Sequence, residues 1–331
     1  MEQYLQANLR AQLIDRRERL STAVDHFADT KHLVDLLRQV DSALERMDGG
    51  VYGLCDGCQE PIEADRLLAD PLLCYCLDHL NAHQRTALQQ DLDLAARIQS
   101  GLLPQREFHS RHWEACYHYE PAGAVSGDYC ELLNPADGDG RLFFSVGDVS
   151  GKSVAASLLM AHLHAMLRSL LSAELSLREI VERANRIFCT SAIPSKFATL
   201  VCGRAADSGE VEICNAGHCP PVVFPDGGPG IEATGLPLGL FAGAEYSVRK
   251  LTLAPNQGLL LYTDGLTEAR NPLDEEFGVE RLSTFLRHQS HLPGPELIRS
   301  CRQQLSEFVG SAPRTDDITI MLLRRRPMFQ H

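Results

Sequence analysis

Residues 141–171 read RLFFSVGDVSGKSVAASLLMAHLHAMLRSLL, and they show how the second half of the chain is built. The apolar run at 141–146 predicts a buried strand, and Gly147-Asp148 after it is a turn signal. The stretch 154–171 is apolar, but ionisable residues interrupt it, so it predicts a buried or amphipathic helix rather than a membrane span. Asp148 is therefore expected at the end of a strand and directly before a helix.

Three other short stretches place a carboxylate beside a strand in the same way. They are VSGDYCE with Asp128, LLLYTDGLTEA with Asp264, and RTDDITIMLL with Asp316 and Asp317. Each alone is more typical of a turn than of a ligand, because Asp-Gly after a strand is a common turn signal. Together they predict several carboxylates at strand ends, with a glycine beside three of them to allow close approach of the backbone.

Such a set of oxygen ligands suits hard divalent cations. Two Mg²⁺ or Mn²⁺ ions about 4 Å apart lower the pKa of a bridging water and clamp phosphoryl oxygens during in-line displacement. The sequence therefore predicts metal-dependent hydrolysis of a phosphoester, with no protein nucleophile.

The motifs of three other classes of hydrolase are absent from the sequence. A P-loop ending at Gly151-Lys152-Ser153 would need glycine where the chain has Val146. No cysteine is followed by an arginine at the spacing of a cysteine phosphatase loop, and there is no GxSxG motif for a serine hydrolase.

The order of these motifs resembles one known family. ARIQSGLLP at 96–104 is followed by the stretch quoted above, and then by FATLVCG, NAGHCPP, GLPLGL, YTDGLTEARN, EEFGVERL and TDDIT. Over about residues 95–325 the chain resembles the SpoIIE/RsbU-type branch of the PPM metal-dependent Ser/Thr protein phosphatases. The resemblance implies an α+β fold, an α-β-β-α sandwich of two antiparallel sheets with the metals at one edge.

The same resemblance implies roles for individual residues. Asp128 and Asp148 would hold two Mn²⁺ or Mg²⁺ ions together with the carbonyl of Val149. Asp264 and Asp316 would complete the second site, with Asp317 as the alternative to Asp316. Glu131 acting through water and Lys152 contacting phosphate are further candidates.

The first half of the chain contains a different metal motif. Cys55-x2-Cys58 is followed, after seventeen residues, by Cys76-x2-His79. Two chelating pairs of soft ligands predict a tetrahedral Zn²⁺ site, and four protein ligands leave no open position, so the zinc is expected to be structural. Cys74 is an alternative ligand within the second pair.

Residues 47–79, with YG before the first cysteine pair, EPI, and RL-x-A-x-P before the second, resemble the zinc finger of the DksA/TraR family. His79 stands where that family usually has a fourth cysteine. In that family a helical hairpin precedes the finger and enters the secondary channel of RNA polymerase, with acidic residues at its tip. The expected turn of the present chain has Asp25 and Asp29 nearby, but no convincing match to the tip motif.

Apolar residues recur at steps of three and four over residues 1–50, which predicts two helices in an antiparallel hairpin. A further seam at 88–102 predicts a helix that connects the two halves. The expected domains are a hairpin with a zinc finger at 1–80, a linker helix at 81–107 and a phosphatase domain at 108–331. The narrow apolar stripe of the linker helix suits a homodimer seam.

The chain has 331 residues and a formal charge of −13, which argues against direct nucleic-acid binding. No apolar signal core opens the sequence, so we expect a cytoplasmic protein without a membrane partner. In that compartment the 11 cysteines are expected to be metal ligands and buried thiols rather than disulfides.

The acidic motifs and the PPM resemblance together imply a bacterial signalling phosphatase that acts on phosphoserine or phosphothreonine. The PPM resemblance implies a phosphorylated STAS-domain anti-anti-sigma factor as substrate. The alternative is a transcription modulator that binds RNA polymerase through the hairpin.

Overall fold

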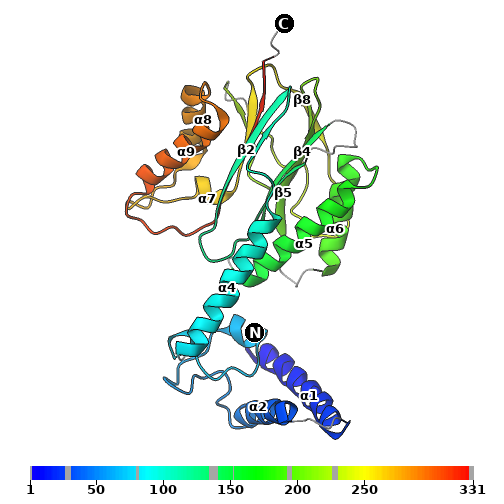
Figure 1. The fold of residues 1–331 in the computed structure, drawn as a ribbon, viewed down its shortest axis with the longest axis vertical. Coiled ribbons are helices and arrows are strands. Elements are labelled where there is room, and N and C mark those ends of the chain that lie inside the picture. Colours follow the sequence, from blue (N-terminus) through cyan, green and yellow to red (C-terminus); the bar gives the residue numbers. More distant parts are fainter. Residues whose placement is uncertain are drawn as a thin grey trace. The chain divides into compact units, whose positions relative to one another are not determined.

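The computed structural model describes residues 2–26, 31–79, 82–133, 141–151, 153–191, 196–225 and 230–327. Two residues named above, Asp29 and Lys152, lie outside these ranges. The chain forms two compact units, Met1–Asp91 and Leu92–His331. The boundary between them falls inside helix α4 (Ala82–Leu102) (Figure 1).

The first unit begins with the predicted helical hairpin, made of α1 (Glu2–His26) and α2 (Lys31–Asp48). The helices are antiparallel, because Arg10 pairs with Asp48 at 2.7 Å and Arg17 pairs with Asp41 at 2.6 Å. These ion pairs are exposed and contribute little to stability. The apolar seam between the helices supplies the main attraction.

A small cysteine-rich segment packs against the hairpin. It contains α3 (Ala64–Ala69) and the short 3₁₀ helix η1 (Leu77–His79). Both parts share one apolar cluster, whose buried members are Leu9, Leu13, Val40, Ala43, Tyr52, Cys55, Ile62, Leu67 and Cys76. Among the residues whose burial the structure describes, this core is small, which makes a bound metal a useful additional support.

The second unit contains two five-stranded sheets, and all paired strands in them are antiparallel. The first sheet has the order β1 (Glu107–His109), β2 (Trp113–Glu120), β10 (Ile318–Arg325), β9 (Gly258–Tyr262) and β7 (Val222–Phe224). The second sheet has the order β3 (Asp128–Leu133), β4 (Leu142–Val149), β5 (Ala198–Ala205), β6 (Glu210–Ala216) and β8 (Arg249–Thr252).

Helices cover the outer face of each sheet, which confirms the predicted α-β-β-α sandwich (Figure 1). The second sheet is covered by α5 (Val154–Leu171) and α6 (Leu177–Ser191). The first is covered by α7 (Asp264–Thr267), α8 (Gly278–Gln289) and α9 (Gly294–Val309).

Helix α5 is the one helix in the described ranges with the length and composition of a membrane span. Its apolar face is accounted for within the second unit. Met160, Leu163 and Leu167 are buried in the core that this helix forms with the second sheet. The prediction of a packed helix is therefore consistent with the structure.

Strand alternation decides which side chains reach the interior between the sheets. On β3, Cys130 and Leu132 belong to the core between the sheets, whereas Tyr129 belongs to the core under α5 and α6. Because successive side chains point to opposite faces, Asp128 lies on the inner face with Cys130. By the same alternation, Asp148 continues the inner row of β4 that contains Val146.

Phe144 tests the importance of this inner row. Its side chain is fully buried between the sheets. We expect Phe144→Ala to lower the free energy of unfolding of the second unit by roughly 3–5 kcal/mol, because it leaves a cavity. Denaturant melts measure this change. The matched control Leu158→Ala removes a side chain that is 66% exposed on α5 and should change stability by less than about 0.5 kcal/mol. Equal effects of the two substitutions would contradict this assignment of the core.

Candidate metal centre

Asp128 and Asp148 lie directly opposite each other on neighbouring strands. They are paired positions in the β3–β4 ladder. Gly127 makes the approach possible: a Cβ there would lie 2.9 Å from the carbonyl oxygen of Val149 and 3.3 Å from Oδ1 of Asp148. Two carboxylates and one carbonyl, all three named as ligands from the sequence, thus come from one corner of the second sheet.

Asp264 and Asp316 are brought together by the other sheet. Asp264 lies two residues after the end of β9, with Thr263 between them. Asp316 lies two residues before the start of β10, and β10 is paired with β9. A Cβ on Gly265 would lie only 1.9 Å from the carbonyl oxygen of Asp317 and 3.0 Å from Cβ of Asp316. The two acidic turns therefore touch, and only glycine fits between them.

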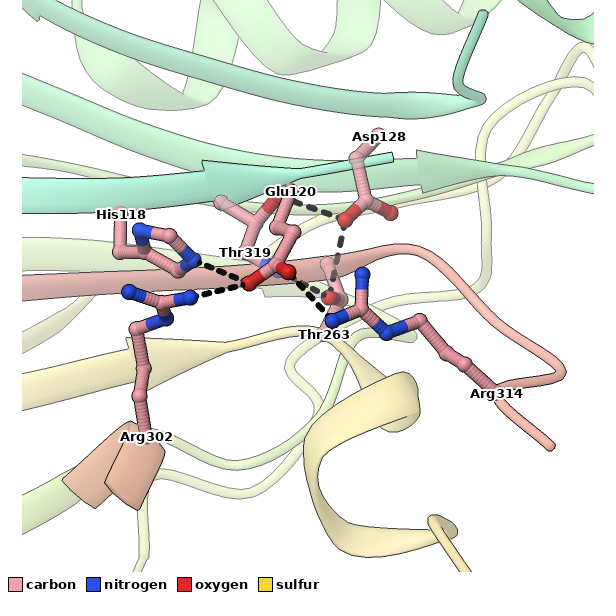
Figure 2. Close-up of polar contacts among 7 residues, drawn as sticks. All are labelled: His118, Glu120, Asp128, Thr263, Arg302, Arg314 and Thr319. Carbon is pink, nitrogen blue, oxygen red and sulfur yellow. Dashed lines mark hydrogen bonds and ion pairs between the residues drawn. The ribbon is translucent and has the colours of Figure 1, made fainter. Parts of the chain in front are cut away.

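Two threonines join these corners across the sandwich. Oδ2 of Asp128 accepts a hydrogen bond from Oγ1 of Thr263 at 3.0 Å and another from Oγ1 of Thr319 at 2.5 Å (Figure 2). Thr263 comes directly before Asp264, and Thr319 comes three residues after Asp316. One carboxylate thereby fixes the distance between the two acidic pairs.

The electrostatics of this corner favour a bound cation. Burial raises the pKa of Asp128 well above its usual value, and the neighbouring charges of Asp148 and Asp317 raise it further. Hydrogen bonds from the two threonines only partly oppose these effects. Carboxylates that repel one another in a buried place are the donor set that a divalent cation stabilises, so the residues fit the predicted Mn²⁺ or Mg²⁺ ions.

Asp317 has a different environment from Asp316. Its Oδ1 accepts the N–H of Ala122 at 2.7 Å, its Oδ2 accepts the N–H of Gly127 at 3.0 Å, and it is buried. Both oxygens are therefore used to hold the loop that leads to Asp128. This environment favours Asp316 over Asp317 as a ligand.

We call the place where Asp128, Asp148, Asp264 and Asp316 meet the metal corner. The side chain of Glu131 does not reach it, contrary to the expectation from the sequence. Its carboxylate is fully buried and pairs with Arg168 of α5, at 2.7 Å from Nε and 3.0 Å from Nη2. His164 Nδ1 lies 3.6 Å away. Because Glu131 is three residues from Asp128, strand alternation turns it to the opposite face of β3.

Another carboxylate, Glu268, was not identified from the sequence. It stands four residues after Asp264. Burial raises its pKa, and the charges of Asp264, Glu276 and Asp316 raise it further. The signal that could have revealed it is the helical spacing of four residues, which places both carboxylates on one side of a turn.

The last turns of α4 also hold the corner. Gln99 is buried; its Nε2 donates to the carbonyl of Ser126 at 2.7 Å, and its Oε1 accepts the N–H of Ser126 at 2.9 Å. Oγ of Ser126 in turn accepts the N–H of Asp128 at 3.0 Å. The helix is thus linked to Asp128 through one intervening residue.

The first unit contains a separate cluster of ligand atoms. Those of Cys55, Cys58, Cys76 and His79 all lie within 4.8 Å of one another. Sγ of Cys76 is 3.8 Å from Sγ of Cys58 and 3.2 Å from Nδ1 of His79. Cys74 is not part of the group, since its thiol donates to the carbonyl of Leu72 at 3.4 Å. Three sulfurs and one imidazole fit tetrahedral Zn²⁺.

Local geometry prepares this cluster for a metal. Burial would raise the pKa of Cys55, but hydrogen bonds from the backbone of Cys76, Cys58 and Gly57 lower it to about 6. A thiolate is the form that binds metal. A Cβ on Gly57 would lie 2.6 Å from the ring of His79, so glycine is needed where the imidazole approaches the first knuckle.

Comparisons with known proteins agree with this geometry. The family model of Stage II sporulation protein E (SpoIIE) matches residues 138–326, more than half of the chain. That range includes Asp148, Asp264 and Asp316 but begins after Asp128.

Two curated relatives match at lower identity. Protein IcfG of Synechocystis is 26% identical over 265 residues, which is 71% of this chain but only 41% of IcfG. Phosphoserine phosphatase RsbU of Bacillus subtilis is 23% identical over 245 residues, 72% of this chain and 71% of RsbU. The chain therefore spans less than half the length of one of these relatives.

Among solved structures, the SiaA-PP2C domain of Pseudomonas aeruginosa superposes with a TM-score of 0.64 at 23% identity. The match covers 74% of this chain and 99% of that domain, which shows a shared fold. The matched family model shows that the chain belongs to the SpoIIE family of PPM-type phosphatases.

Proposed function

We propose that the protein is a metal-dependent phosphatase that hydrolyses phosphoserine or phosphothreonine in a protein. The observation that carries the proposal is that two acidic pairs, Asp128 with Asp148 and Asp264 with Asp316, are joined by hydrogen bonds from Thr263 and Thr319 to Asp128. When bound there, two Mn²⁺ or Mg²⁺ ions would supply an ionised water and neutralise phosphoryl charge.

The chain's own contribution is to hold the ligands in place. Thr263 and Thr319 fix the carboxylate of Asp128 from the opposite sheet. Asp317 holds the preceding loop through Ala122 and Gly127. The carbonyl of Val149 adds a neutral ligand at the same corner. The side chains thus need little rearrangement when the ions bind, which is the preorganisation that metal-assisted hydrolysis requires.

For the substrate we favour a phosphorylated STAS-domain regulator in the cytoplasm. The PPM resemblance implies it, and the relative RsbU is named a phosphoserine phosphatase. The assay that would identify it directly is incubation with candidate phosphoproteins, followed by intact mass.

For the first unit we propose a structural Zn²⁺ on Cys55, Cys58, Cys76 and His79, with the hairpin and finger acting as a regulatory module. Helix α4 would connect this module to the metal corner, and a homodimer seam along α4 fits the same role. We do not favour the alternative of an RNA polymerase-binding modulator, because the matched family model and the acidic corner both point to phosphoester hydrolysis.

The carboxylates can be tested one at a time. We expect Asp148→Asn and Asp264→Asn each to reduce Mn²⁺-dependent hydrolysis of p-nitrophenyl phosphate at least about a hundredfold, because each removes a negative metal ligand. Circular dichroism should show an intact fold. The control is Asp207→Asn, since the Asp207 side chain is 63% exposed. Wild-type rates in either ligand variant would refute the metal assignment.

Gly265 tests whether the two acidic turns must touch. We expect Gly265→Ala to weaken Mn²⁺ binding at least about tenfold, because the added methyl group would push Asp316 and Asp317 away. Isothermal titration calorimetry measures the affinity. Gly243→Ala is the matched control, since a Cβ at Gly243 has no neighbour within 4 Å. Unchanged affinity in Gly265→Ala would show that the contact is unimportant.

The zinc proposal predicts a stoichiometry. We expect about one zinc per chain in the purified protein. Cys58→Ser should lose the zinc and Cys74→Ser should retain it, because Cys58 belongs to the ligand cluster and Cys74 does not. Atomic absorption measures the metal. Chelation should also unfold the first unit, because the metal supports its small core. Zinc-free protein with a folded first unit would be contrary to the proposal.

A further inference from the structure

A cavity of about 490 Å³ lies on the side of the first sheet that carries α7 and α9, and it reaches the metal corner. Its wall includes Gly265 and Asp316, which belong to the two acidic turns described above. It also contains three arginines, Arg270, Arg302 and Arg314. A polar cavity that borders the site of chemistry is a place where part of a substrate can bind.

Two of these arginines converge on one carboxylate. Glu120, at the end of β2, accepts a hydrogen bond from Nη2 of Arg302 at 2.8 Å and one from Nη2 of Arg314 (Figure 2). Nε2 of His118 lies 2.7 Å from the same carboxylate. Burial would raise the pKa of Glu120, but Arg314, His118 and Arg302 lower it to about 2. Glu120 is therefore a permanent anion that holds the two guanidinium groups together.

The guanidinium groups keep donors for another anion. Each guanidinium carries several N–H donors in a planar fork. Within the described ranges, Arg302 and Arg314 each donate only to Glu120, and both side chains are 41% exposed. Arg270 differs, because it already forms ion pairs with the carboxylates of Asp274 and Glu276. The two remaining arginines thus form a fork that suits a carboxylate or phosphate.

The charge balance of the cavity depends on the metal centre. Its acidic lining residues are Glu120, Glu268 and Asp316, which match the three arginines in number. Asp316 is a proposed ligand, and Glu268 lies close enough to the ligand carboxylates for them to raise its pKa. Bound cations would offset these charges and leave Glu120 alone against Arg302 and Arg314, since Arg270 is already paired with Asp274 and Glu276. The cavity then becomes positive.

We propose that Arg302 and Arg314 bind an acidic side chain of the protein substrate, close in its sequence to the phosphorylated residue. Arg314 stands two residues before Asp316, so an anion held there lies beside the metal corner. This inference rests on the proposed phosphatase function and adds the substrate's charge pattern to it.

The test uses two synthetic phosphoserine peptides, one with Asp and Glu on both sides of the phosphoserine and one with Asn and Gln at those positions. With Mn²⁺ present, we expect the full-length wild-type chain to prefer the acidic peptide about tenfold in kcat/KM, as one charge-assisted hydrogen-bonded pair would give. Added salt should shrink the preference, because the contact is partly exposed.

Two substitutions have opposite expected effects. Arg302→Gln should reduce the preference to less than about threefold, whereas Glu120→Gln should increase it, because the internal competitor for the arginines is gone. The matched control is Arg299→Gln, which changes an exposed arginine of α9 outside this cavity and should keep the wild-type preference.

Hydrolysis of both peptides without preference would overturn the docking inference and leave the phosphatase function standing. An equal loss on both peptides in Arg302→Gln would also overturn it, because that result indicates a merely structural role. If the wild type hydrolyses p-nitrophenyl phosphate but neither peptide, the docking inference fails and the phosphatase function stands. If it hydrolyses none of the three, the proposed function fails as well.

Discussion

The carboxylate of Asp128 is the group on which the arrangement of the metal corner depends. It lies on β3 of one sheet and accepts hydrogen bonds from threonines that precede and follow the acidic turns of the other sheet. Burying a carboxylate is costly unless it is hydrogen-bonded or paired with a cation. The threonines supply the first condition, and the surrounding carboxylates create the need for the second. The fold therefore stores electrostatic repulsion at the place where divalent ions would relieve it.

Glycine decides how closely the four acidic segments can meet. Gly127 lies against the carbonyl of Val149, and Gly265 lies against the carbonyl of Asp317. At both places a methyl group would overlap a backbone oxygen, and no rotamer change could remove that clash. The glycines beside the aspartates are thus explained by contact between backbones rather than by turn conformation. The structure gives neither of these two glycines a positive φ angle.

The sequence predicted the parts of the site whose signals are local. Strand patterns predicted Asp148 and Asp264 at the ends of apolar strands and Asp128 at the start of another. Their proposed roles as ligands came from the order of the motifs and the family resemblance, because each pattern alone is more typical of a turn. The alternation of side chains along a strand would have excluded Glu131, because a residue three positions from Asp128 faces the other side of the sheet. The structure places Glu131 under α5, where it pairs with Arg168. The threonine contacts could not be predicted, because a hydroxyl in a strand has no pattern that reveals a partner in another sheet.

The ion-pair cluster around Glu120 shows a second limit of sequence reasoning. Its members come from β2, α9 and the loop before β10, and Arg314 is 194 residues from Glu120. Nothing local in the chain pairs them. The antiparallel register of β2 with β10 brings Glu120 near the loop that carries Arg314, and the packing of α9 on the first sheet brings Arg302. The same register places Glu120 opposite Ile318, two residues after Asp316. Strand pairing thus brings the arginine fork and the acidic corner together, so the ions at one would set the charge that an approaching substrate meets at the other.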